Sequence, residues 1–301
     1  MKKLSFILAL FCPLFLCSDP QVVLVTGASK GIGKAVCEKL AEKGHIVYAT
    51  MRSPDKFPGF VNSSIRIKAL DVTCEEQLKK VVEEVIAEQK KIDVLVNNAG
   101  VLSISPCETF TLTEAKDQFN INFFGAFSMM QAVLPKMREQ KSGKIINITS
   151  TSGFDPAIGL DIYAASKSAL ETLSESMASY LSHFGVHISL IQPGPVKTDM
   201  VTSAKKGSVK LENNPYELFQ SHLISWYSER LGSGQNPSEI GDLVDKIMSQ
   251  ENPKFRYQTT PGAVKRAQKN LVDITGCENI KNKQIFSNEL FERPIDGTRT
   301  W

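Results

Sequence analysis

The stretch from residue 21 to residue 44 constrains the fold more than any other part of the sequence. Residues 21–25 form a short apolar run, as in a buried strand. Residues 26–33 (Thr-Gly-Ala-Ser-Lys-Gly-Ile-Gly) follow at once, and residues 34–43 have a helical pattern that Gly44 ends. Glycines at a strand-to-helix turn let backbone N–H groups approach a pyrophosphate at the helix N-terminus. This order predicts the first unit of a dinucleotide-binding sheet.

A second pattern concerns proton transfer. Tyr163 and Lys167 are four residues apart, so on a helix both side chains face the same way. A tyrosine with an ordinary pKa near 10 carries protons poorly at neutral pH. We therefore expect the Lys167 ammonium to lower the pKa of Tyr163. Ser150 ends an apolar strand pattern, and its hydroxyl can hold a carbonyl oxygen, with Thr151 and Ser152 as rivals by sequence alone.

Strand and helix patterns alternate from about residue 19 to residue 262. This predicts an α/β fold: one Rossmann-type, doubly wound parallel sheet with helices on both faces. The 301 residues, 42% of them hydrophobic, can bury one such core, and no Pro/Gly/Ser-rich linker divides it. Expected strands are residues 22–26, 45–49, 65–70, 94–97, 144–149, 187–192 and 255–259. Expected helices are residues 32–43, 73–89 (from a capping box at 73–76), 113–140, 163–183, 236–249 (Asn236 cap, Pro237 first) and 263–273.

Six motifs, in this order and spacing, resemble the motif series of the short-chain dehydrogenase/reductase family. They are residues 26–33, Asn97-Asn-Ala-Gly100, Asn122-x-x-Gly125, Ser150, Tyr163-x-x-x-Lys167 and Pro193-Gly-Pro-Val-Lys-Thr198. The match runs from about residue 22 to residue 260. It implies an oxidoreductase that moves a hydride between a nicotinamide and an alcohol or carbonyl. Residues 49–52 and 236–260 look most like the branch that holds 17β-hydroxysteroid dehydrogenase type 1 and the photoreceptor retinol dehydrogenase.

The resemblance implies a role for each motif residue. Tyr163 would give or take the proton, Lys167 would bind the nicotinamide ribose, and Ser150 would bond the substrate oxygen. Asn122 would hold a water beside the lysine; an amide bonded within a kinked helix is the competing interpretation. The implied cofactor-binding set is Gly27, Ser29, Lys30, Gly31, Ile32, Gly33, Arg52, Asp71, Val72, Asn98, Ala99, Gly100, Tyr163, Lys167, Pro193, Gly194, Val196 and Thr198.

Within that set, Asp71 would hold the adenine amino group, unless it is a turn or helix-capping aspartate. Thr198 would hold the nicotinamide carboxamide, so that one face of the ring meets the substrate carbon.

The end of the second expected strand predicts which cofactor binds. NAD-binding proteins place an acid about 20 residues beyond the glycines to accept the ribose 2′-hydroxyl. Here Met51 holds that place, Arg52 follows it, and Lys30 lies in the glycine turn. Two cations suit a 2′-phosphate, so we expect NADP(H) to be preferred. The nearby acid Asp55 leaves NAD(H) as the alternative cofactor. The alternative interpretation of Lys30 and Arg52 is that both are solvated surface cations.

Residues 200–232 interrupt the sheet pattern and predict a small helical lid. The segment is rich in large apolar side chains, which suit a lipophilic alcohol or ketone such as a steroid or retinoid. An amphipathic helix packed on the core is the alternative. These side chains are Leu211, Tyr216, Leu218, Phe219, Leu223, Trp226 and Tyr227. His222 is the one histidine of the segment, and it does not align with the steroid-binding histidine of the related branch.

Residues 1–18 resemble a signal peptide or a membrane anchor. Two lysines precede an apolar run from Leu4 to Cys17, which is short for a span of about 20 residues. Because nicotinamide dinucleotides are intracellular, an uncleaved anchor or a lumenal setting with its own cofactor is easier to reconcile with the motifs than export; a cytoplasmic protein is the alternative. Residues 263–301 form a C-terminal extension.

Composition and spacing also limit the partners. The net charge of +3 is too small to imply nucleic acid, and the six cysteines and four histidines lack zinc-site spacing, so we expect no metal. Small residues of the helix from residue 163 (Ala164, Ala165, Ser168, Ala169, Ser174 and Ala178) predict a homodimer or homotetramer. Two other functions stay open: a 3-oxoacyl reductase whose carrier binds Lys205, Lys206 and Lys210, and a catalytically silent dinucleotide-binding regulator.

Overall fold

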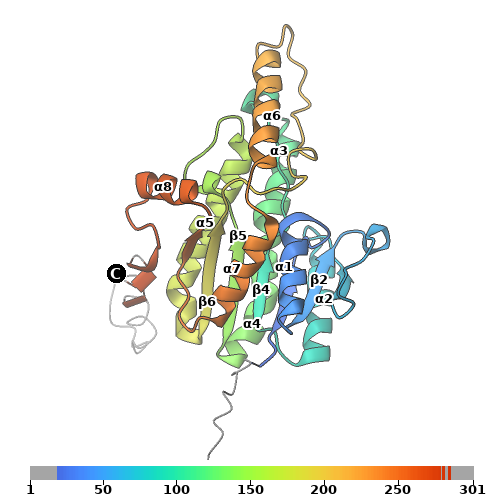
Figure 1. The fold of residues 1–301 in the computed structure, drawn as a ribbon, viewed down its shortest axis with the longest axis vertical. Helices are drawn as coiled ribbons and strands as arrows, with labels where there is room; N and C mark the ends of the chain where they lie inside the picture. The colour runs from blue at the N-terminus through green and yellow to red at the C-terminus, as the bar shows by residue number, and fades with distance from the viewer. Residues whose placement is uncertain (1–18, 279, 282–283, 286–301) are drawn as a thin grey trace, which may run out of the picture.

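The computed structural model describes residues 19–278, 280–281 and 284–285, and a parallel sheet runs through its centre (Figure 1). The seven strands lie in the order β3-β2-β1-β4-β5-β6-β7, so the chain reverses its direction of winding between β1 and β4. The strands are β1 (Val22–Val25), β2 (Ile46–Met51), β3 (Arg66–Ala69), β4 (Val94–Asn97), β5 (Gly143–Ile148), β6 (Val186–Gln192) and β7 (Arg256–Gln258).

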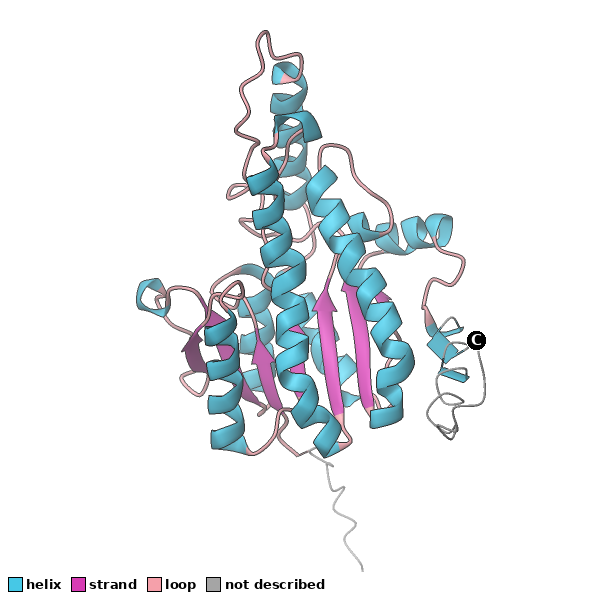
Figure 2. Cartoon of the chain, turned by 180° about the vertical axis from the view of Figure 1, so that it is seen from behind, coloured by secondary structure: helices cyan, strands magenta, loops and turns pink. Residues whose placement is uncertain are grey.

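Helices cover both faces of the sheet. The α-helices are α1 (Gly31–Glu42), α2 (Glu75–Gln89), α3 (Leu112–Phe119), α4 (Gly125–Gln140), α5 (Asp161–Leu181), α6 (Glu217–Gly232), α7 (Pro237–Ser249) and α8 (Pro261–Asn270). On one face, α1 and α7 pack on alternate residues of the central strands. On the other face, seen in Figure 2, α2, α4 and α5 form the layer. The predicted α/β fold with helices on both faces is confirmed.

The central strands are apolar because both of their faces are buried. Every residue of β1 and β4 is buried, as expected for parallel strands between two helix layers. Their side chains alternate between the cores: Val23 and Val25 face α1 and α7, whereas Val22 and Leu24 face the other layer. Because β1, β4 and β5 pair in parallel, their carboxyl ends lie at one edge of the sheet.

The elements that were expected to form a lid lie beyond that edge. The strand arrows in Figure 2 point toward this end of the molecule, where α6 and the loop before it project (Figure 1). A third apolar cluster, which includes Leu160, Tyr163, Val201 and Tyr227, connects α6 with the start of α5. The helix α6 of the expected lid segment therefore lies over the carboxyl ends of the strands.

One local prediction is wrong. The capping box at residues 73–76 does not form, because the Asp71 carboxylate accepts hydrogen bonds from the Thr73 N–H (2.9 Å) and hydroxyl (2.7 Å). Cys74 is then the N-cap of α2, and no side chain caps it. On α5, three of the small residues expected at a subunit contact, Ala164, Ser174 and Ala178, are buried in this chain's own core. By contrast, the Asn236 cap is confirmed: Glu239 accepts from the Asn236 N–H at 2.9 Å.

In the part of the chain that the structure describes, no helix has the length and apolar character needed to cross a membrane. The signal-like segment predicted at residues 1–18 lies outside the described residues. The described residues also contain no group of three or more His, Cys, Asp or Glu side chains arranged to hold a metal ion.

Candidate active site

A cavity of about 1170 Å³ opens at the carboxyl ends of the strands. Almost every residue of the predicted catalytic and cofactor-binding sets lines it. Those residues are Gly27, Ser29, Lys30, Gly31, Ile32, Arg52, Asp71, Val72, Asn98, Ala99, Gly100, Ser150, Tyr163, Lys167, Pro193, Gly194, Val196 and Thr198. Gly33 and Asn122 lie behind its wall. We call the part beside the glycine turn the cofactor half and the part beneath α6 the substrate half.

The glycine turn is held in a shape that side chains would prevent. Gly27 and Gly31 have φ of 66° and 56°, in the left-handed region. A Cβ on Gly27 would lie 2.7 Å from the Ala99 Cα, and a Cβ on Gly33 would lie 2.5 Å from the Gly27 carbonyl oxygen. No side chain caps the N-terminus of α1. The turn thus fits a pyrophosphate, which first-turn N–H groups can bind.

Hydrogen bonds fasten this turn to the end of β4. The Thr26 hydroxyl accepts from the N–H groups of Asn98 (3.0 Å) and Ala99 (3.1 Å). In return, the Asn98 side-chain amide donates to the carbonyls of Thr26 (2.9 Å) and Gly27 (3.0 Å). Asn98 therefore connects the ends of β1 and β4. These bonds explain why Thr26 and Asn98, 72 positions apart in the chain, belong to one site.

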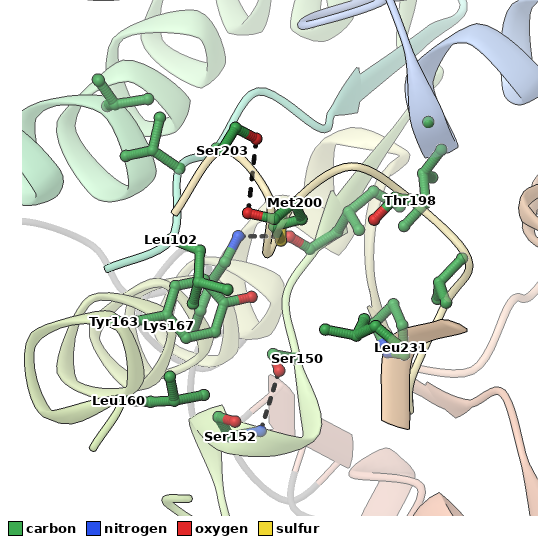
Figure 3. A pocket seen from close by; sticks show the side chains of 18 of the residues that line it. Leu102, Ser150, Ser152, Leu160, Tyr163, Lys167, Thr198, Met200, Ser203 and Leu231 are labelled. Atoms are coloured by element: carbon green, nitrogen blue, oxygen red, sulfur yellow. Dashed lines mark hydrogen bonds between the residues drawn. The ribbon is translucent and has the colours of Figure 1, made fainter. Parts of the chain in front are cut away.

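Ser150, Tyr163 and Lys167 meet at the junction of the two halves (Figure 3). Tyr163 and Lys167 project from the first turns of α5, and the Lys167 Nζ lies 5.8 Å from the centre of the Tyr163 ring. The Lys167 ammonium donates to the Ile148 carbonyl at 2.9 Å. Ser150, just after β5, accepts from the Ser152 N–H at 3.1 Å. The geometry brings the three predicted groups together, with Ser150 next to the Tyr163 hydroxyl.

Burial dominates the protonation of this group. It raises the pKa of Tyr163, and a hydrogen bond with the Ser150 hydroxyl opposes that rise. Burial lowers the pKa of Lys167 to about 8, against the attraction of the Glu171 carboxylate. The pKa of Tyr163 in this structure is therefore raised rather than lowered as expected, because desolvation of the phenol is the largest influence on it.

Glu171 is a buried acid that sequence reasoning did not single out. It lies one turn beyond Lys167 on α5, where its carboxylate accepts from the Thr149 hydroxyl (2.8 Å) and the Gln192 amide (2.9 Å). Burial raises its pKa, and these two bonds oppose the rise. Its spacing of four residues from Lys167 was a readable signal.

Asn122 has a structural environment. It lies in a π-helical turn (Asn120–Phe124) between α3 and α4. Its amide donates to the Val101 carbonyl (3.0 Å) and the Ser166 hydroxyl (3.1 Å), and its oxygen accepts from the Val101 N–H (2.8 Å). The side chain is thus engaged in holding the loop after β4 against α5; these partners lie outside its own helix, unlike the bond within a kinked helix of the competing interpretation.

The residues expected to select the cofactor lie where their positions implied. Met51 ends β2, and Arg52 and Lys30 line the cofactor half. Neither cation pairs with a carboxylate among the described residues; the Lys30 Nζ approaches the Ser203 hydroxyl at 3.5 Å. Asp71 also lines the cavity, although its carboxylate holds the turn at Thr73.

The substrate half is apolar and is built largely from α6. Of the apolar residues named in the expected lid, Phe219, Leu223, Trp226 and Tyr227 line the cavity, together with His222. Leu211, Tyr216 and Leu218 do not. The Tyr227 hydroxyl donates to the Ile158 carbonyl at 2.8 Å, which joins α6 to the loop before α5. Leu160 and Leu102 close the cavity beside Tyr163 (Figure 3).

Arg266 is a cavity residue that the sequence did not reveal. It comes from α8, in the C-terminal extension, and lines the same cavity. Its guanidinium donates to the Thr151 hydroxyl at 3.0 Å and forms an ion pair with Asp155. Thr151 and Asp155 belong to the loop that follows Ser150, so the extension braces one wall of the site. No motif signals a contact between residues 111 positions apart.

Comparisons with known proteins agree with this geometry. A family model described as short chain dehydrogenase matches residues 21–208. The 3-ketodihydrosphingosine reductase of Bacteroides thetaiotaomicron is 38% identical over 245 residues, which cover 81% of this chain and 89% of that protein. Retinol dehydrogenase 8 of Homo sapiens is 34% identical over 258 residues, covering 80% of this chain and 81% of that protein.

A solved structure gives the same result. The crystal structure of a short-chain dehydrogenase from Streptomyces avermitilis superposes with a TM-score of 0.71 at 29% identity, covering 93% of this chain and 99% of that one. A retinol dehydrogenase, one of the enzymes named by the expected branch, is thus among the relatives. The chain belongs to the short-chain dehydrogenase/reductase family of oxidoreductases.

Proposed function

We propose that this protein is an NADP(H)-dependent reductase of a lipophilic ketone or aldehyde. The observation that carries the proposal is the position of Tyr163: a buried phenol, beside Ser150 and Lys167, at the junction of a phosphate-accepting turn and an apolar cavity. A buried, protonated phenol at this position can give its proton to a carbonyl oxygen, which is the proton transfer that reduction requires.

In the proposed reaction, the substrate carbonyl oxygen lies between the hydroxyls of Ser150 and Tyr163. The carbonyl carbon would receive a hydride, which is the chemistry that a reduced nicotinamide held in the cofactor half would supply. Tyr163 donates its proton to the oxygen as the C=O bond becomes a C–O bond, and the product is an alcohol. Lys167, charged below a pKa of about 8, stabilises the negative charge that remains on Tyr163.

The cofactor half supplies the groups that NADP(H) needs. Backbone N–H groups of the glycine turn would bind the pyrophosphate, and Arg52 and Lys30 would bind the 2′-phosphate. In favour of NADP(H) over NAD(H), these cations have no carboxylate partner among the described residues, and an apolar Met51 stands where an acid would accept the 2′-hydroxyl. Asp71 and Thr198 would contact the adenine and the carboxamide.

The substrate half favours a substrate with a long apolar part. Its wall consists of aromatic and aliphatic side chains of α6, and the relatives are named for 3-ketodihydrosphingosine and retinol. We place a ketone on a long aliphatic chain first, because the relative named for one is 38% identical. Retinoid and steroid carbonyls come second. Residues 200–232 serve as the substrate lid, and residues 19–262 as the catalytic domain.

Spectrophotometry with NADPH and NADH tests the function. The purified protein is offered a long-chain 3-keto base, retinal, steroid ketones and a 3-oxoacyl thioester, with the Tyr163→Phe variant as control. We expect oxidation of NADPH with at least one lipophilic carbonyl and little with the variant. Turnover of the thioester alone would instead support the 3-oxoacyl reductase, and cofactor binding without any turnover would support the silent regulator.

A homodimer or homotetramer also stays a prediction, which light scattering can test.

A further inference from the structure

The outer side of α6 exposes large apolar side chains to solvent. Leu218, Phe219 and Trp226 are 69%, 42% and 49% exposed, and Ile158, on the loop that Tyr227 joins to α6, is 70% exposed. With about 100° of rotation per residue, positions 218, 219 and 226 fall on one side of the helix. We call these four residues the lid face. Contiguous exposed apolar surface of this kind marks a contact site in a soluble protein.

The lid face is continuous with the mouth of the cavity. Phe219, Trp226 and Ile158 line the cavity as well as facing solvent. Tyr163 lies in the same cavity and in the apolar cluster beneath α6. A ligand that enters past the lid face therefore reaches the proposed proton donor along an apolar wall.

Unpaired cations flank this face. The loop before α6 carries Lys205, Lys206 and Lys210, all exposed, and Glu212 is the one acid between Met200 and Tyr216. None of the three lysines forms an ion pair with another described residue. Both views show this loop running beside α6 (Figures 1 and 2). The Lys205 backbone exchanges hydrogen bonds with Ile104 and Leu102, both at 3.0 Å, so the loop is fixed to the segment that follows β4.

We propose that the lid face docks on an anionic lipid surface, so that the cavity opens into the lipid. Aromatic and aliphatic side chains flanked by lysines and an arginine are the combination that binds a membrane interface. Arg230, 5.0 Å above the Trp226 ring, adds a further cation at the mouth. An acidic carrier protein would account for the lysines but not for the exposed Leu218 and Trp226, so the lipid surface explains more of the observations.

Tryptophan emission tests the docking separately from catalysis. The chain has two tryptophans, and Trp301→Phe leaves Trp226 as the single reporter in the full-length protein. The vesicles are phosphatidylcholine, alone or mixed with phosphatidylglycerol. We expect a blue shift of Trp226 emission, and quenching by brominated acyl chains, that are larger with the anionic vesicles. Because this readout needs no substrate, it can succeed even if the proposed reductase activity fails.

Charge variants identify the contact. Leu218→Asp should remove most of the shift, because a carboxylate is costly in the interface, yet it should leave NADPH binding unchanged since Leu218 does not line the cavity. Ser228→Asp adds the same charge to α6 outside the lid face and should retain the shift. Lys206→Gln with Lys210→Gln should reduce binding to the anionic vesicles only.

Three outcomes would overturn the proposal. One is unchanged Trp226 emission while the protein sediments with vesicles, which would assign binding to another segment. The second is equal loss of the shift in Leu218→Asp and Ser228→Asp. The third is no vesicle binding together with a shift on adding an acyl carrier protein, which would assign the face to that partner.

Discussion

The cofactor half and the substrate half of the cavity are held together in different ways. The glycine turn of the cofactor half is held through the backbone. Gly27 and Gly31 have positive φ, and an added Cβ on Gly27 would meet the backbone of Ala99. The Thr26 hydroxyl and the Asn98 amide bind main-chain groups. Side chains of α6 and α8 form much of the substrate half. The glycine turn of the cofactor half should tolerate almost no change, whereas the substrate half can change its specificity by substitution while the fold persists.

Tyr163→Phe has the largest expected effect because it acts where the halves meet. The ring and its packing stay, but the proton donor is lost. Turnover should fall by about 10²–10⁴, the usual contribution of general acid catalysis. NADPH titration should still show binding, since the turn at Gly27 and Gly31 is unaltered. Near-normal turnover would refute the role of Tyr163, and loss of cofactor binding would show that the halves are not separate.

Two glycine variants test whether the glycine turn tolerates substitution less than α6 does. Gly27→Ala places a methyl group 2.7 Å from the Ala99 Cα at a residue with positive φ. Left-handed backbone alone costs about 1–2 kcal/mol, so we expect lower unfolding free energy and NADPH affinity reduced about tenfold or more. Gly232→Ala, at the end of α6, meets no atom within 4 Å and should leave both quantities unchanged or slightly raise stability. Urea unfolding and NADPH titration measure the pair, and similar losses in both variants would contradict the comparison.

The pH dependence of reduction should report Lys167. Its pKa of about 8 implies that kcat/KM for reduction is level near pH 7 and falls about tenfold per unit above pH 8, where the ammonium loses its proton. The raised pKa of Tyr163 keeps the phenol protonated through this range. Lys167→Arg, slower but always charged, should lack the fall near pH 8. If Lys167→Arg shows the same fall of kcat/KM near pH 8, the fall comes from a group other than Lys167.

The same shift has a defined consequence for stability. The folded pKa of Lys167 lies below its ordinary value of 10.5, so between about pH 8 and 10.5 the unfolded chain binds more protons at this site. The contribution of Lys167 to the free energy of unfolding therefore rises with pH across that window. Lys167→Met should remove this rise.

Cofactor preference is expected to change by a smaller factor. Arg52→Ala removes a charge-assisted contact worth about 1.5–3 kcal/mol, or tenfold and more in affinity for NADPH. Met51→Asp adds a carboxylate that repels a 2′-phosphate and accepts from a free 2′-hydroxyl. The double variant should prefer NADH with turnover nearly unchanged under saturating cofactor, while Met51→Leu should behave like the parent. If the ratio of kcat/KM for NADPH and NADH does not move, Lys30 and Arg52 are only surface cations.

The two halves also differ in how far the sequence predicted them. The glycine turn, the strand ends and the Tyr163–Lys167 pair were readable because each depends on neighbours in the chain. Burial was not readable: the pKa of Tyr163 depends on distant elements that enclose it, and the spacing of Lys167 pointed in the wrong direction. The capping box at Thr73 failed because the Asp71 carboxylate bonded the same groups. The place of Arg266 in the site was not predictable because its partner, Asp155, is 111 residues away in the chain.

Arg266 also gives the smallest effect that we expect. Arg266→Ala leaves Asp155 without its ion pair and Thr151 without a donor, so the wall beside Ser150 should loosen. Because both partners of the pair are about a third exposed, the pair is worth on the order of 1 kcal/mol, and kcat/KM should fall about fivefold. Lys265→Ala, on the same helix and outside the cavity, is the matched control. If α8 only covers the surface, the two variants will be alike. If it braces the substrate half, Arg266→Ala should raise KM for a bulky ketone more than for a small one, while NADPH binding in the cofactor half stays constant.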